Sequence, residues 1–313
     1  MIVNFVYNPN VNNAPIGFTA TLNAVANFFQ STFSDPVTIN INVGYGTVGS
    51  NNQPLSGGAL GESLTFLTSL GNNSTTSYAQ MKSALAADAK SADDSSSVAS
   101  LPATNPNNGN YWVSTAEAKA LGLMGPNTAL DGYVGFSNAA GIFDYDRSDG
   151  ITAGKYDFFG VVAHEVSEIM GRIFLVGSTI GTTQHSYDAM DLFHFSAPGV
   201  RTFSGTQTGY FSVNNGATNL DNWNTNPNGD FGDWAASAVN DAALAFGNPG
   251  VVESFTPTDI RLRTSQATPM PVCRQPRIST SRRHLSKFRM TSIGISTPTF
   301  FCRTITVRLR SGW

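Results

Sequence analysis

Residues 164–172 carry the side chains best suited to chemistry, in the order HEVSEIMGR. His164 and Glu168 are four residues apart, so on a helix they point to the same side. A divalent metal held by both would have Glu165 beside it, which is the layout of the H-E-x-x-H zinc helix, where the glutamate is the general base. Here Glu168 stands in place of the second histidine, and a carboxylate oxygen also binds zinc. The motif therefore predicts a metal site.

The same side chains also have a plainer interpretation, as the polar and solvated face of an ordinary helix. Two features of the sequence count against it. The flanking residues 156–163, YDFFGVVA, are unusually apolar, which favours a buried cleft floor over an open surface. Only 12% of the residues are charged, so three ionisable side chains within five residues are less expected by chance.

One helix over residues 157–170 would position the motif. Asp157 is a suitable N-cap, apolar side chains recur at helical spacing, and Gly171 is a usual stop residue. Upstream, a strand over 2–7, a helix over 17–33 and a strand over 37–43 suggest an α/β unit.

The remaining elements follow from periodicity and capping signals. We expect a loop over 44–76, helices over 77–90, 93–101 and 114–121, a strand over 131–136, strands over 189–196 and 210–213, an Ala-rich helix over 234–246, and a last helix beginning at 258.

Two acidic segments raise the question of structural calcium. Residues 144–150, DYDRSDG, resemble a calcium loop, but they have one residue too many and lack the downstream glutamate, so a polar turn is the better interpretation. Asp230 and Asp233, in an Asn- and Gly-rich loop, could bind calcium, but turn chemistry explains them equally well.

Charge divides the chain of 313 residues into two parts. Residues 1–262 hold eight basic and all 21 acidic residues, whereas residues 263–313 hold ten basic and no acidic ones, which together give the net charge of −3. Both cysteines, Cys273 and Cys302, also fall in the second part. We interpret 1–262 as the folded domain and 263–313 as a basic tail, either disordered or the product of a frameshift. A basic arm for nucleic acid is the third alternative, which the acidic body disfavours.

Composition favours an extracellular protein, because Gly, Ser, Thr and Asn are abundant and Lys is scarce. The first residues, MIVNF, lack the basic and apolar regions of a signal peptide. Secretion is still the expectation, with a leader lost from the gene model or another export route, and the alternative is a protein that stays inside the cell. No apolar run of about 18 residues occurs, so we expect no membrane span.

Together these segments resemble a family of bacterial, mostly secreted metalloproteases of metzincin-like type. The resemblance rests on residues 156–172, on 191–201 (DLFHFSAPGVR), and on 210–213 with 228–234 (NGDFGDW). It covers nearly all of residues 2–262. It implies an α+β fold with a metzincin-like mixed sheet packed on helices around a central metal-binding helix. It also implies that the strand over 131–136 is the edge strand that pairs with substrate.

The resemblance further implies a zinc peptidase, with His164 as ligand and Glu165 as base. Metzincins have histidine at the positions of Glu168 and Phe174, so the third ligand is open. Asp191 lies in the second matched segment and is our first choice, and the alternatives are Asp188, His185 and His194. Tyr187 is a candidate donor to the developing oxyanion.

The predicted function is a zinc-dependent endopeptidase that acts on proteins or peptides, with no nucleic-acid partner. Its ligands would be His164, Glu168 and Asp191. One imidazole and two carboxylates form a harder set than most zinc sites have, so another divalent cation such as manganese or calcium could replace zinc. The alternative is a non-catalytic secreted or surface binding module that keeps the peptidase scaffold.

Overall fold

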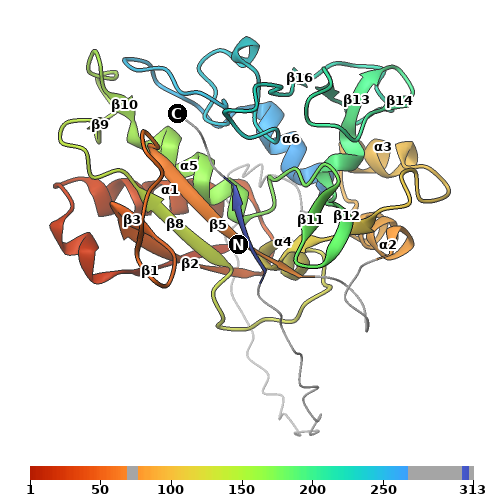
Figure 1. The fold of residues 1–313 in the computed structure, drawn as a ribbon, viewed down its shortest axis with the longest axis horizontal. Helices are drawn as coiled ribbons and strands as arrows, with labels where there is room; N and C mark the ends of the chain where they lie inside the picture. Colours follow the sequence, from red (N-terminus) through yellow and green to blue (C-terminus); the bar gives the residue numbers. More distant parts are fainter. Residues whose placement is uncertain (69–76, 267–304, 310–313) are drawn as a thin grey trace, which may run out of the picture.

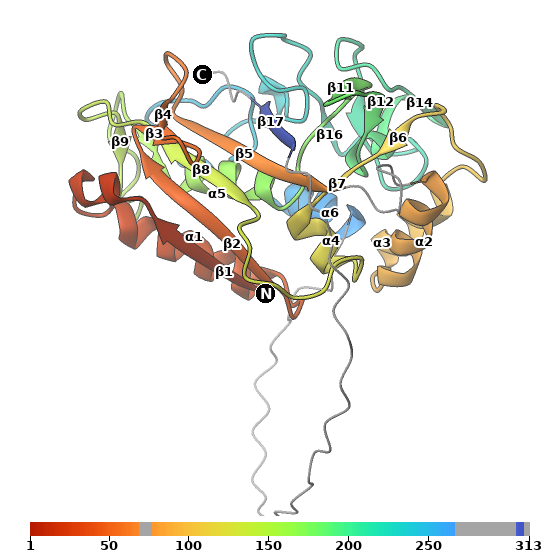
Figure 2. The ribbon, with the colours of Figure 1, turned by 60° about the horizontal axis from the view of Figure 1, so that its bottom comes forward.

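The computed structural model describes residues 1–68, 77–266 and 305–309, the last segment as backbone only. Its main sheet has the strand order β1-β2-β8-β5-β17 (Figures 1 and 2). These strands are β1 (Ile2–Tyr7), β2 (Thr38–Tyr45), β8 (Gly132–Phe136), β5 (Gly61–Thr68) and β17 (Ile305–Leu309). The first three run parallel, and β5 is antiparallel to β8 and to β17. Helices and mixed sheets together confirm the predicted α+β class.

Two helices, α1 (Phe18–Thr32) and α5 (Phe158–Ile169), lie along one face of this sheet (Figure 2). The predicted stripe of α1 is buried, with Leu22, Val25 and Phe29 fully inaccessible. These side chains share one apolar core with α5 and with the sheet residues Ile41 and Val134. The predicted strand–helix–strand unit is therefore confirmed, and its burial holds α5 against the sheet.

A second apolar core gathers side chains from Tyr78 to Leu262, among them Trp223 and Trp234. Those two rings stack at 4.2 Å. Its helices are α2 (Tyr78–Asp88), α3 (Ala92–Ser100), α4 (Thr115–Ala120) and α6 (Pro257–Gln266). A serine is the N-cap of each of the first three helices. Ser77 and Ser91 form capping boxes, and the Ser114 side chain accepts the amide of Glu117.

The remaining elements are short. They are η1 (Pro9–Asn13), β3 (Thr47–Val48), β4 (Gln53–Pro54), β6 (Asn110–Tyr111), β7 (Val113–Ser114), β9 (Phe143–Asp144), β10 (Tyr156–Asp157), β11 (Ser178–Ile180), β12 (Thr183–Tyr187), η2 (Met190–Phe193), β13 (His194–Ala197), β14 (Val200–Arg201), β15 (Tyr210–Phe211), β16 (Asp221–Asn222) and η3 (Ala236–Ala238).

Four expectations need correction. The segment expected to be a loop, 44–76, contains β5, which is buried along most of its length. The strand near 131–136 is not an edge strand, because β8 lies between β2 and β5. Residues 189–196 begin as the 3-10 helix η2 and become a strand only at His194. The expected helix over 234–246 is reduced to η3.

The predicted tail begins inside α6, which continues to Gln266, four residues past the expected boundary. The interpretation of the tail as disordered or frameshifted falls mostly on 267–304 and 310–313, which lie outside the described residues. Within the described part of the chain, no helix combines the length and apolarity that crossing a membrane would require.

Candidate metal centre

The central helix α5 carries His164, Glu165 and Glu168 into the interior. Its N-cap is Asp157, as predicted, and the Asp157 carboxylate accepts a hydrogen bond from the amide of Phe159. All three functional side chains are buried, with at most 1% of each residue exposed. Glu168 therefore does not belong to a solvated surface face, and the plainer interpretation of the motif does not hold.

The imidazole of His164 is oriented from both sides. Its Nδ1 lies 2.9 Å from the carbonyl oxygen of Ala242, which is an acceptor, so Nδ1 carries a proton in that contact. In the neutral ring the lone pair is then on Nε2. That atom lies 3.4 Å from Oε1 of Glu168 and 3.6 Å from Oδ1 of Asp233.

Asp233 is the third member of a group of possible metal ligands that includes His164 and Glu168. Among the described residues, His164, Glu168 and Asp233 are the His, Cys or acidic side chains whose ligand atoms all lie within 4.8 Å of one another. Asp233 is fully buried, and its Oδ2 has no hydrogen-bond partner in the described part of the chain. A buried carboxylate oxygen without a donor is costly, and a cation would satisfy it.

The position of Asp233 depends on its neighbour in the chain. Trp234 is fully buried against Trp223, and its indole nitrogen donates to Asp259 at 2.7 Å. The backbone amide of Trp234 also bonds to the carbonyl of Ala243, next to the residue that orients His164. The same pair of loop segments therefore brings both Asp233 and the Ala242 carbonyl to α5.

Arg172, just past the end of α5, binds the two carboxylates from the other side. Its Nη1 donates to Oδ1 of Asp233 at 2.6 Å, and its Nη2 lies 3.9 Å from Oε1 of Glu168. The Nε atom donates to the hydroxyl of Ser167, which donates to the carbonyl oxygen of His164. The guanidinium is thus fixed at several points.

The pKa shifts follow from burial opposed by these charges. Burial alone would lower the pKa of His164, but Asp233 and Glu168 together raise it above its ordinary value. Burial alone would raise the pKa of Glu168, yet the contacts with His164 and Arg172 lower it. For Asp233 the burial effect prevails over His164 and Arg172, and the pKa is raised.

The strand β5 contacts both glutamates of the helix. Gly61 lies so close to Glu165 that a Cβ atom built on it would come within 2.5 Å of Oε1. Two residues on, and therefore on the same face of the strand, Ser63 donates to Oε2 of Glu168 at 2.7 Å. Sequence reasoning missed this strand and with it the role of Ser63.

The structure does not bring Asp191 to His164 and Glu168. Its carboxylate accepts backbone amides from Asp188, Leu175 and Val176 at 2.8 to 3.3 Å, which ties the loop after α5 to η2. The loop residue that reaches the two helix ligands is Asp233, which sequence reasoning considered only for calcium. Asp188 pairs with Asp191, accepting its amide at 3.0 Å.

The other candidates from the sequence also lie apart from the group. His185 is exposed on β12, and Tyr187 packs on Tyr111 and Phe203. His194 is buried, and its ring stacks on Phe174 at 5.3 Å.

Burial lowers the pKa of His194 to about 4, from an ordinary value of 6.5. Because the pKa of His194 is lower in the folded state than in the unfolded state, protonation of the imidazole favours unfolding. The stability that comes from keeping His194 neutral is complete above pH 6.5 and is lost as the pH falls toward 4. The change corresponds to roughly 3 kcal/mol in the free energy of unfolding. Urea unfolding between pH 4 and 7 should show this loss in the wild type and not in His194→Leu. Exposed His185→Asn is the control, and parallel curves for the wild type and His194→Leu would refute the prediction.

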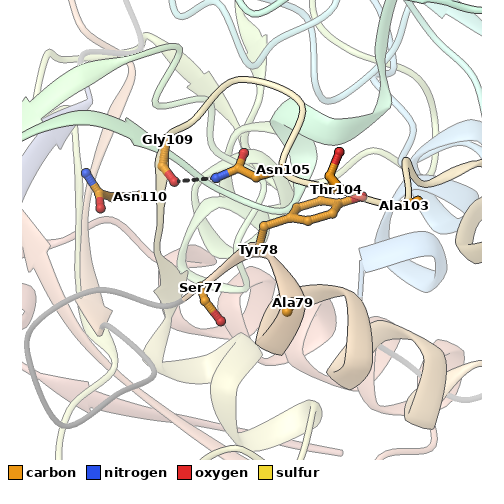
Figure 3. A pocket seen from close by; sticks show the side chains of 8 residues that line it. All are labelled: Ser77, Tyr78, Ala79, Ala103, Thr104, Asn105, Gly109 and Asn110. Atoms are coloured by element: carbon orange, nitrogen blue, oxygen red, sulfur yellow. Dashed lines mark hydrogen bonds between the residues drawn. The ribbon is translucent and has the colours of Figure 1, made fainter.

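A surface pocket lies elsewhere, at the start of α2, lined by that helix turn and by residues 103–105 and 109–110 (Figure 3). Its rim is held by the Asn105 side chain, which donates to the carbonyl of Gly109 at 3.0 Å. None of the described residues that line this pocket is a histidine, a cysteine or an acid.

Comparisons of the chain with protein-family models, with curated proteins and with solved structures find no match. The resemblance to metzincin-like peptidases therefore stays a prediction, and the site must be interpreted from its own geometry.

Proposed function

We propose that this chain is a metal-dependent peptidase, with zinc as the preferred ion, His164, Glu168 and Asp233 as its ligands, and Glu165 as the general base. The observation that supports this most is the buried group itself. One imidazole nitrogen and two carboxylates of these three residues converge from a helix and a distant loop, within reach of a single ion. Three protein ligands leave one coordination position for water, as catalytic zinc sites require.

A bound divalent ion would supply a more acidic water and would polarise the carbonyl of the scissile bond. Glu165 would accept a proton from that water and pass it to the leaving amine, which is general acid–base catalysis by one carboxylate. The carbonyl of Ala242 keeps the proton of His164 on Nδ1. Gly61 provides the space in which the Glu165 carboxylate lies against β5.

The metzincin-like features of the proposal are the central helix, the mixed sheet and the strand β5 beside the helix carboxylates. Within the backbone pairings described, β5 runs antiparallel to β8 and is followed by β17 at the sheet edge. By the criterion that excludes β8, β5 is not an edge strand either, because it lies between β8 and β17, so the proposal assigns no strand to substrate pairing. Secretion is part of the same proposal and rests on composition and on the resemblance to mostly secreted peptidases.

One observation favours a second candidate, a binding module without catalysis. Arg172 and a protonated His164 would balance the charges of Glu168 and Asp233 without any metal. In that case the group is a buried ion network that fixes the end of α5 to the Asp233 loop.

The test of the peptidase proposal is cleavage of a peptide library by the zinc-loaded protein, with Glu165→Gln as the active-site control. Cleavage by the wild type that requires bound metal and is lost in the variant would support the proposal. No cleavage of any peptide by zinc-loaded protein would favour the binding module.

A further inference from the structure

Each of the three proposed ligand side chains has two polar atoms that could bind a metal. In each side chain, one of these two atoms contacts a residue outside the group. The carbonyl oxygen of Ala242 accepts a hydrogen bond from Nδ1 of His164. The hydroxyl of Ser63 donates a hydrogen bond to Oε2 of Glu168. Arg172 donates to Oδ1 of Asp233, the oxygen 3.6 Å from Nε2 of His164, and Oδ2 is the buried oxygen left without a hydrogen-bond partner in the described part of the chain. These partners come from three different segments, so the pattern does not follow from the helix alone.

We infer that Ser63 and Arg172 are positioning residues that leave Glu168 and Asp233 one metal-binding oxygen each, so that the site prefers a four-coordinate ion of the zinc class to calcium. The inference rests on the proposed metal site and adds two positioning residues to it, with a structural reason for the preference for zinc. Neither side chain would contact the ion itself.

The preference follows from the number of donor atoms. Calcium takes six to eight oxygen ligands and commonly uses a carboxylate through both oxygens. Here a nitrogen and two singly available carboxylate oxygens give three protein donors, which suits a tetrahedral ion with one water. Burial, with the nearby charges of Glu168 and Asp233, raises the pKa of Asp230, and this carboxyl is not in the group whose ligand atoms lie within 4.8 Å.

Ser63 is well suited to orient Glu168. It is 1% exposed on β5, a strand held on one side by β8, so its hydroxyl has a fixed position. The bond of 2.7 Å joins that hydroxyl to Oε2, whereas Oε1 faces His164. Partners of this kind, which hold a ligand without touching the metal, typically contribute 10- to 100-fold to metal affinity.

Arg172 is the equivalent partner of Asp233. Its Nη1 bonds to both the Asp233 carboxylate and the carbonyl of Gly232, and its Nε bonds to Ser167. Only the planar fork of arginine makes all these bonds from one position, so lysine would keep the charge and lose the orientation.

The experiment is titration of the metal-free chain with zinc and with calcium, and separately with cobalt, whose visible absorption reports coordination number. The variants are Ser63→Ala and Arg172→Lys, with Ser63→Thr to restore the hydroxyl. Ser186→Ala is the matched control, since this buried hydroxyl binds the Trp112 indole outside the site. Thermal unfolding of each variant checks that it is folded.

We expect the wild type to bind zinc far more tightly than calcium and to give a four-coordinate cobalt spectrum. Zinc affinity should fall roughly 10- to 100-fold in Ser63→Ala and Arg172→Lys, with a weakened cobalt spectrum, and should recover in Ser63→Thr. If Arg172→Lys does not fold, Ser63→Ala decides.

Unchanged zinc affinity and an unchanged cobalt spectrum in Ser63→Ala would overturn the positioning role while leaving the metal site in place. Calcium binding by the wild type as tight as zinc binding would overturn the ion preference. A wild type that binds neither ion would overturn both this inference and the proposed function.

Discussion

Replacing Glu165 by glutamine is expected to lower kcat/KM for peptide cleavage by roughly 10²- to 10⁴-fold, the usual contribution of a general base. Glutamine has nearly the same shape as glutamate but cannot accept the proton of the attacking water. The packing of this side chain against Gly61 should be kept, because the substitution leaves the number of heavy atoms unchanged. The measurement is steady-state cleavage of a peptide selected from the library, with the variant and the wild type loaded with zinc.

The matched control is Glu62→Gln, a buried glutamate that accepts the amide of Ser56 at 2.6 Å and has no part in the proposed mechanism. It should cleave close to the wild-type rate. Both variants should keep the metal content and the unfolding temperature of the wild type. Cleavage that persists at the wild-type rate in Glu165→Gln would exclude Glu165 as the base.

Replacing Arg172 by methionine should destabilise the metal-free protein by about 3–5 kcal/mol, because it leaves the buried carboxylate of Asp233 without its partner. Arg172 is 1% exposed and Asp233 is fully buried, so water cannot replace the lost interaction. This loss is large beside a typical total stability of about 5–15 kcal/mol. Urea unfolding at neutral pH measures it.

The control for this variant is Arg261→Met. Arg261 forms a comparable pair with Asp93, at 2.8 Å, but both side chains are about a third or more exposed, at 46% and 34%. An exposed pair of this kind contributes only about 0–1 kcal/mol. Equal destabilisation by the two substitutions would show that Arg172 does not stabilise a buried charge.

The helix that carries the motif was predictable because its signals are local. Asp157 caps it, Gly171 follows it with a φ of +108°, and its apolar side chains are buried. Spacing alone placed His164 and Glu168 on one side, and the structure brings them to 3.4 Å.

The strand β5 was missed because its inward face is partly polar. Gly61, Ser63 and Thr65 alternate along that face and look like loop residues in the sequence. They are buried, and Gly61 and Ser63 lie against the two glutamates of α5. A strand that contacts a polar site does not show the apolar alternation on which strand prediction relies.

The third member of the group was missed for a different reason. Asp233 is brought to α5 by the packing of Trp234 on Trp223, a contact between residues with no common periodicity. Asp191 has a plausible place in the sequence, but its carboxylate accepts backbone amides. Nothing in the sequence distinguishes a carboxylate that caps a loop from one that faces a metal.

Metal content tests the central claim most directly, by elemental analysis of the chain after zinc loading and removal of excess ion. The wild type should hold a stoichiometric amount of zinc, Asp191→Asn should keep it, and Asp233→Asn should lose it. Zinc that stays bound in Asp233→Asn, or a wild type that holds none, would contradict the assignment of His164, Glu168 and Asp233 as a metal centre.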